Sequence, residues 1–256
     1  MNIYHMSYTP RFVGERMVML SFKGCNFRCL GCLRRKSERD IYAESVEYLE
    51  DWTLDRIIEK IRELRPHKIY LGGHEPTLDP DLTCIVEKLS ELDAYIVLMT
   101  NGSLLTTNYI HKLIKAGLNE VIISVKAFDH EKHMYYTGTS IEPVLNAIME
   151  LAEVDDPNFR FEVETILIPG INGPEDIEKL AIFLSRIDKS IKLFIEPYIP
   201  SVNTFREPTR DELIEAVTRA MKHLYVVSYH PLHSEVQEMR KGKRRAIFID
   251  ILPRKK

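Results

Sequence analysis

The segment RMVMLSFKGCNFRCLGC, residues 16–32, joins an apolar run to a loop that holds three of the four cysteines in this 256-residue chain. The run itself, residues 16–22, has the length and composition of one strand. Cysteines used only for packing are scattered along a chain, and three clustered thiols do not make a disulfide framework. The segment therefore indicates a metal site formed by Cys25, Cys29 and Cys32 directly after a strand.

Similar apolar runs recur along the chain, with segments of helical spacing between them. The expected strands are residues 16–22, 68–72, 94–100, 120–126, 159–168 and 191–199. Helical spacing appears at 57–64 and 82–89, and further helices are expected near 106–116, 141–153, 174–187 and 208–223. Thr53 and Pro174 are expected helix starts.

Strands that alternate with helices predict βα units and a parallel sheet. Six units predict an α/β fold, a partial (β/α)6 TIM-type barrel open on one side, because a full barrel has about eight strands. Short C-terminal extra strands are expected at 224–230 and 246–252. We expect a single domain over residues 1–256, with a core at about 17–223 and a C-terminal extension at about 224–256.

The composition narrows the possible partners and locations. A net charge of −3 predicts no general attraction to nucleic acid or to an anionic membrane. No apolar run approaches the roughly 18 residues of a membrane span, and the N-terminus lacks a signal-peptide pattern. We therefore expect a cytoplasmic location, where thiols stay reduced. The basic stretch at 240–245 is expected to be a solvated loop.

Polar segments, four of the six with glycine, follow the expected strands. They are residues 23–32, 72–77, 100–103, 126–133, 169–173 and 196–205. In barrels and open parallel sheets, sites form at the carboxyl ends of the strands. The six segments are therefore expected to converge on one face as one site.

The cysteine spacing, Cys25-x3-Cys29-x2-Cys32, leaves the choice of metal open. A structural zinc site needs a fourth protein ligand, for which His5 or His74 is available. A [4Fe–4S] cluster held by three thiolates would instead leave one iron for a small molecule, which suits catalysis.

The fourth cysteine, Cys84, stands between Leu82 and Ile85 in a segment of helical spacing. We expect it to pack in the core, as free cysteines commonly do. A single remaining thiol also cannot build an auxiliary iron–sulfur cluster.

The cysteine motif after the first strand of a partial α/β barrel resembles that of the radical S-adenosylmethionine (SAM) enzymes. The resemblance implies that Cys25, Cys29 and Cys32 hold a [4Fe–4S] cluster whose fourth iron is chelated by S-adenosyl-L-methionine. It further implies an oxidoreductase that reductively cleaves SAM to a 5′-deoxyadenosyl radical for hydrogen abstraction. The chemistry would belong to the cofactor, with the protein supplying binding and orientation.

Two strand-end segments extend this resemblance. GGHEP, residues 72–76, resembles the family's Gly-Gly-Glu-Pro motif, which contacts the SAM amino group, and TNG, residues 100–102, resembles a segment beside the ribose. The resemblance implies cofactor contacts at Gly72, Gly73, Glu75 and Asn101. We interpret His74 as a spacer rather than a catalytic histidine.

SVKAFDHEKHMYYTG, residues 124–138, resembles the glycyl-radical-enzyme activases, relatives of pyruvate formate-lyase activating enzyme. The match implies that Lys126 pairs with the SAM carboxylate, with catalytic importance, and that Ser124 stands where these activases have aspartate. ILIPGING, residues 166–173, resembles their adenine-side segment, which implies a contact at Ile168. Phe27 and Gly31 complete the expected cofactor contacts, although Gly31 replaces an aromatic residue common in activases.

The resemblance leaves the substrate open. The most specific hypothesis is a glycyl-radical enzyme as partner, and the alternative is a small-molecule or nucleotide-like substrate; both need a one-electron reductant of the ferredoxin or flavodoxin type. A non-catalytic zinc or iron–sulfur binding protein is the hypothesis from another class. Candidate substrate-side residues are His130, His133, Tyr135, Tyr136, Asn203 and Arg206.

Overall fold

The computed structural model describes residues 1–12, 15–33, 45–49, 52–200 and 205–236. The chain divides into two compact units. The first consists of Met1–Asn26, Ser37–Ile123 and Pro143–Phe161, and the second of Phe27–Lys36, Ser124–Glu142 and Glu162–Lys256. The expectation of a single domain stays a prediction.

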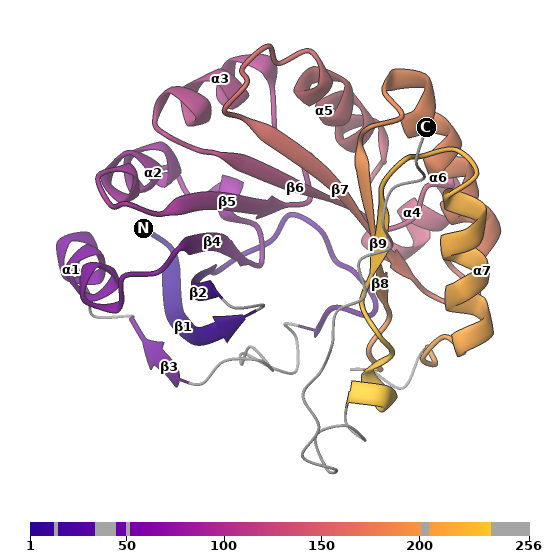
Figure 1. The fold of residues 1–256 in the computed structure, drawn as a ribbon, viewed down its shortest axis with the longest axis horizontal. Helices are drawn as coiled ribbons and strands as arrows, with labels where there is room; N and C mark the ends of the chain where they lie inside the picture. Colours follow the sequence, from indigo (N-terminus) through magenta and orange to yellow (C-terminus); the bar gives the residue numbers. More distant parts are fainter. Residues whose placement is uncertain (13–14, 34–44, 50–51, 201–204, 237–256) are drawn as a thin grey trace. The chain divides into compact units, whose positions relative to one another are not determined.

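The first unit is a sheet with helices packed along it (Figure 1). Its strands are β1 (Ile3–Phe12), β2 (Glu15–Phe22), β3 (Ser45–Tyr48), β4 (Lys68–Gly73), β5 (Tyr95–Thr100) and β6 (Glu120–Val125). Their order is β3-β1-β2-β4-β5-β6. Strand β1 is antiparallel to β2 and β3, whereas β2, β4, β5 and β6 are parallel.

The helices of the first unit begin and end where local chemistry dictates. They are α1 (Leu54–Leu64), the short η2 (Pro76–Leu78), α2 (Leu82–Ser90), α3 (Thr107–Lys115) and α5 (Glu142–Ala152). Thr53 caps α1, because its hydroxyl accepts from the backbone N–H of Arg56 at 3.3 Å. Ile57, Ile58 and Ile61 form the buried face of α1, at the spacing seen in the sequence.

The second unit repeats the strand–helix pattern. It contains the end of β6, then α4 (His130–Thr137), β7 (Arg160–Leu167), α6 (Pro174–Ile187), β8 (Lys192–Pro197), α7 (Arg210–Ala220) and β9 (Val227–Tyr229). Strands β7, β8 and β9 are parallel neighbours. The hydroxyl of Thr165 in β7 donates to the carbonyl of Val125 in β6 at 2.8 Å. Helices α6 and α7 lie side by side, linked by the ion pair of Glu178 and Arg219 at 2.7 Å (Figure 1).

Strands β7 and β8 have two unlike faces. One face is buried and, apart from a threonine, apolar: Val163, Thr165, Leu167, Leu193 and Ile195. The other face is half-buried and carries charges: Glu162, Glu164, Ile166, Lys192, Phe194 and Glu196. Because side chains alternate along a strand, the charged residues of both strands share one side of the sheet.

All six expected strands are present as β2 and β4 to β8, and β9 lies within the first expected extra strand. The second, at 246–252, falls outside the described residues, as does the basic stretch at 240–245. Strands β1 and β3 and helix α4 were not expected. Within the described residues, no helix is long and apolar enough to cross a membrane.

The prediction for Cys84 is wrong, because this side chain is exposed. Helix α2 buries Leu82, Ile85, Val86 and Leu89. These positions define one face at steps of three and four residues, and position 84 lies off that face. The position of Cys84 on helix α2 therefore outweighed the general preference of cysteine for burial.

Candidate functional site

Glu75 is a buried carboxylate that joins the ends of β4 and β5 in the first unit. Its exposed fraction is 1%. Oε1 accepts hydrogen bonds from the backbone N–H and the hydroxyl of Thr77, and from the hydroxyl of Thr100 at 2.6 Å. Oε2 accepts from the backbone N–H of Asn101 at 2.7 Å. Hydrogen bonds to a carboxylate are stronger than neutral ones, so these four donors fix Glu75 firmly between the two strand ends.

The glycines before Glu75 let β4 approach β2 closely. Gly73 has φ of +92°, and a Cβ there would lie 2.9 Å from the backbone nitrogen of Phe22. A Cβ on Gly72 would lie 3.2 Å from Sδ of Met19. His74 places Nδ1 3.1 Å from the backbone oxygen of Phe22. Only glycine adopts the Gly73 conformation without strain, and His74 adds a second link to the end of β2.

Cys25 follows β2 and is exposed. Nδ2 of Asn101 lies 3.9 Å from Cys25 Sγ and donates to Oδ1 of Asn26 at 2.8 Å. Oδ1 of Asn101 accepts from the backbone N–H and the hydroxyl of Ser103. The amide of Asn101 thus connects the end of β5 to the start of the cysteine loop.

The remainder of the cysteine loop, in the second unit, is anchored on the end of helix α4. The backbone N–H of Arg28 donates to the carbonyl of Thr137 at 2.7 Å, and that of Leu30 donates to the carbonyl of Tyr136 at 2.9 Å. Carbonyls in the last turn of a helix have no partner inside that helix. The loop supplies the missing donors, which explains why this part of the loop is ordered.

Gly31 lies between Cys29 and Cys32, which are both half-buried, and packs against two tyrosines. A Cβ at position 31 would lie 2.6 Å from the ring of Tyr198 and 2.8 Å from the hydroxyl of Tyr136. Burial, followed by the charge of Cys29, raises the pKa of Tyr136. The two phenol rings fill the space that a side chain at position 31 would need.

Phe27 is buried and meets the ring of His133 edge-on, with the centroids 5.7 Å apart. Nδ1 of His133 lies 3.0 Å from the backbone oxygen of Ala127, and burial lowers the pKa of His133. His133 therefore packs the loop against α4. His130 and Tyr135 are exposed on the same helix.

Lys126, Ser124 and Glu164 form a line of hydrogen bonds in the second unit. Nζ of Lys126 donates to Ser124 Oγ at 2.6 Å, and Ser124 Oγ donates to Glu164 Oε1 at 2.8 Å. On the next strand, Glu196 Oε1 lies 2.7 Å from Nδ1 of His230. Lys126 and His230 follow β6 and β9, Ser124 and Glu196 lie near the ends of β6 and β8, and Glu164 lies in the middle of β7.

Ile168 follows β7 and lies within a buried apolar cluster that includes Ala127 and Tyr198. Its backbone N–H and carbonyl pair with Asn172 across a tight turn. Nδ2 of Asn172 donates to the hydroxyl of Thr165 at 3.0 Å, while its buried Oδ1 has no partner within the described residues. This turn fixes the backbone of the segment expected on the adenine side.

Two further candidates do not join the site. Arg206 forms a two-pronged pair with Glu212, at 2.8 Å and 2.6 Å. Asn203 lies outside the described residues.

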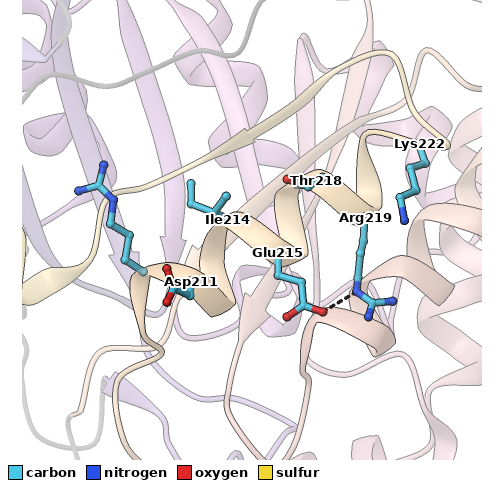
Figure 2. Close-up of a pocket in the computed structure, with 7 residues that line it drawn as sticks. Asp211, Ile214, Glu215, Thr218, Arg219 and Lys222 are labelled. Carbon is cyan, nitrogen blue, oxygen red and sulfur yellow. Dashed lines mark hydrogen bonds and ion pairs between the residues drawn. The ribbon is translucent and has the colours of Figure 1, made fainter.

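A hollow of about 500 Å³ runs along α7 and contains none of the expected site residues. Figure 2 shows its lining side chains, among them Glu215 and Arg219, whose side chains are joined by a hydrogen bond at 2.8 Å. Arg219 also pairs with Glu178 of α6. Charges that satisfy one another on an exposed helix face indicate a solvated surface rather than a site.

Across the described ranges, no three His, Cys, Asp or Glu side chains are placed to hold one metal ion. In a [4Fe–4S] cluster each thiolate binds a different iron, so no such single-ion arrangement is needed. His5 places Nε2 3.1 Å from the hydroxyl of Ser21 in the buried sheet, which does not favour a zinc site completed by His5.

A family model described as the radical SAM superfamily matches residues 19–184. A putative glycyl-radical enzyme activating enzyme of Methanocaldococcus jannaschii is 32% identical over 219 residues, which cover 84% of this chain and 81% of the relative. The chain belongs to the radical SAM superfamily. A probable GTP 3′,8-cyclase of Pyrococcus horikoshii is 27% identical over 232 residues, covering 90% of the chain and 69% of the relative.

A solved structure with bound S-adenosylmethionine shares the fold. Streptococcus suis SuiB bound to S-adenosylmethionine aligns with a TM-score of 0.61 at 17% identity, covering 84% of this chain and 52% of SuiB. The predicted fold class, an α/β partial barrel, is thereby confirmed, and so is the activity class of radical SAM enzyme. The predicted cofactors, a [4Fe–4S] cluster and SAM, are those of the superfamily.

Three residues that lie beside the expected site residues were not singled out in the sequence. Tyr198 was passed over because a lone tyrosine at a strand end has no signature. Glu164 did leave a signal, since charges stand at every second position of FEVE, residues 161–164, whereas Glu196 is the single charge in LFIE, residues 193–196. A charge at that spacing indicates a polar face.

Proposed function

We propose that this radical SAM enzyme binds its [4Fe–4S] cluster through Cys25, Cys29 and Cys32 and cleaves SAM to form a hydrogen-abstracting 5′-deoxyadenosyl radical. The observation that carries the proposal is the cysteine loop, whose backbone is held by the end of α4 and which contains three cysteines within eight residues. When bound, the reduced cluster supplies the electron for the cleavage. The loop supplies a fixed position for the thiolates.

The proposed cofactor contacts divide between the two units. Gly72, Gly73, Glu75 and Asn101 belong to the first, and Phe27, Gly31, Ser124, Lys126 and Ile168 belong to the second. Lys126 provides the cation for the SAM carboxylate. The backbone of Gly72 and Gly73 and the carbonyl of Gly31 provide close contacts without side chains, and Glu75 holds the segment around them.

We propose a glycyl-radical enzyme as the target, supported by the activating-enzyme relative, which the chain matches over most of both lengths. A nucleotide substrate is the second candidate, favoured by the similarity to GTP 3′,8-cyclases. Either activity would use a one-electron reductant of the ferredoxin or flavodoxin type. We further propose that the whole chain forms one radical SAM domain and works in the cytoplasm, where its thiols stay reduced.

The test is anaerobic reconstitution with iron and sulfide, reduction with dithionite, and chromatography for 5′-deoxyadenosine after addition of SAM. The native protein is expected to bind about four irons and to release deoxyadenosine. Cys29→Ala should lose both properties. The matched control is Cys84→Ala, which removes an exposed thiol from α2 and should change neither. A Cys29→Ala protein that still forms deoxyadenosine would refute the ligand assignment.

A further inference from the structure

We propose that Glu164 and Glu196 recognise a basic side chain, lysine or arginine, on a peptide segment of the substrate. The inference rests on the proposed function, in which a protein is the target. It concerns the second unit alone and identifies what that unit contacts beyond the cofactor.

The two carboxylates are neighbours on one face of the sheet. Strands β7 and β8 are parallel, with Glu164 beside Phe194 and Ile166 beside Glu196 in the register. Glu164 and Glu196 are therefore diagonal partners on adjacent strands, within reach of a single group placed between them. Both side chains are half-buried on the charged face.

Each carboxylate has one oxygen engaged and one available. Oε1 of Glu164 accepts from Ser124 Oγ at 2.8 Å, and Oε1 of Glu196 contacts His230 Nδ1 at 2.7 Å. Within the described residues, Oε2 of Glu164 and Oε2 of Glu196 have no hydrogen-bond partner. A third carboxylate of the same face, Glu162, differs because it is paired with Lys192 at 3.0 Å.

The ionised form of Glu164 is disfavoured by burial and by the neighbouring charge of Glu196. Burial raises the pKa of Glu164, and the charge of Glu196 raises it further, while Lys126, Ser124 and His230 oppose the shift. If Lys126 binds the SAM carboxylate, its charge is shared with the cofactor. A cation placed between Glu164 and Glu196 would relieve the repulsion between them.

The neighbouring side chains complete a lined site. Phe194 and His230 meet edge-on, with ring centroids 4.7 Å apart. Ser228 of β9 pairs with Phe194 in the register, which places it on the same face. Ser228 is 3% exposed, and its hydroxyl has no partner within the described part of the chain. Among the described residues, the face thus carries a ring edge, a buried hydroxyl without a partner and two carboxylate oxygens without a partner.

This chemistry selects against a polyphosphate, which carries the same sign of charge as the two glutamates. An ammonium or guanidinium group instead forms charge-assisted hydrogen bonds with carboxylates. The N–H groups of a peptide backbone are also suitable donors for the remaining oxygens. The face therefore fits a basic peptide segment and not a nucleoside triphosphate.

The test uses the reconstituted holoenzyme with SAM and three glycine-centred heptapeptides, flanked by lysine, by serine or by glutamate, together with GTP as a fourth probe. Calorimetry should show the lysine peptide binding at least about tenfold more tightly than the glutamate peptide. Glu196→Gln should reduce that preference to about threefold or less. Glu162→Gln, which removes a carboxylate already neutralised by Lys192, should keep it.

The outcomes separate this inference from the proposed function. The inference is overturned if the native holoenzyme shows no preference for the lysine peptide. It is also overturned if the native holoenzyme binds GTP more tightly than every peptide, and neither result needs a variant. A preference that survives in Glu196→Gln overturns it as well. The proposed function is judged independently, by deoxyadenosine formation in the native enzyme without any peptide.

Discussion

Two sets of carboxylates, one just beyond β4 and one within β7 and β8, are held in opposite ways. Glu75 in the first unit is 1% exposed and accepts four hydrogen bonds from Thr77, Thr100 and Asn101. Glu164 and Glu196 in the second unit are half-buried, and each has one hydrogen-bonding or ion-pair partner among the described residues.

The difference shows how to distinguish a structural carboxylate from one available to a ligand. A buried carboxylate needs hydrogen-bond donors for its oxygens. An unsatisfied buried oxygen costs more free energy of folding than a hydrogen bond to it contributes. Where the protein supplies every donor, the group stabilises the fold. Where the protein supplies only one donor, the group can still accept from a ligand.

The largest expected effect is that of Glu75→Gln. The amide nitrogen would face donors in place of an acceptor oxygen, so we expect a loss of about 1–3 kcal/mol or more in the free energy of unfolding. Urea unfolding of the apoprotein measures this. Glu162→Gln is the matched control, since its carboxylate is half-exposed and paired with one lysine. Equal losses in the two variants would break the distinction drawn above.

The next effect is a pH dependence caused by Glu164. Its pKa in the folded state is raised above the ordinary value of 4.5, mainly by burial. Above pH 4.5 the carboxyl group of Glu164 is therefore more protonated in the folded state than in the unfolded state. The free energy of unfolding decreases as the pH rises from 4.5 through the raised pKa. Glu164→Gln should remove this decrease, so the variant gains stability relative to the native protein as pH rises. Urea midpoints between about pH 4 and about pH 8 measure the difference. Parallel curves would contradict the raised pKa.

The smallest effect is expected at Arg206, where a carboxylate is well paired but close to solvent. Glu212 accepts from Arg206 and from the backbone N–H of Thr209, and the hydrogen bond with Arg206 lowers its pKa to about 2. The stabilisation is present above the ordinary value of 4.5 and is lost as pH falls towards 2. Solvent screens an exposed pair, so Arg206→Ala should cost less at neutral pH than Glu75→Gln. If the same urea assay showed a larger loss of unfolding free energy for Arg206→Ala than for Glu75→Gln, pairing would contribute more to stability than burial.

Much of this architecture is encoded locally and was predictable. Each of the six expected strands has an apolar run that can be recognised without reference to the others. Thr53 and Pro174 mark helix starts, because their side chains favour the first positions of a helix. Strand β1 was not predictable in the same way, since its sequence IYHMSYTPRF mixes polar and apolar residues. Its place is decided by pairing with β2 and β3.

The site residues that belong to a sequence motif were predictable, whereas those that depend on contacts between distant parts of the chain were not. Cys25, Cys29 and Cys32 can be recognised from their spacing in the sequence. That Gly31 must be glycine follows from Tyr136 and Tyr198, which are distant in sequence. Helix α4 was missed because HEKHMYYT has little apolar periodicity, and it buries His133 rather than aliphatic residues.

The anchoring of the cysteine loop on α4 bears on what holds the thiols in place. Arg28 and Leu30 donate to the carbonyls of Thr137 and Tyr136, using only backbone groups. These hydrogen bonds offset part of the entropy lost in ordering the segment. Metal sites that assemble only with their metal couple binding to folding; here α4 shares that task, so replacing a cysteine removes a thiol without removing a backbone anchor.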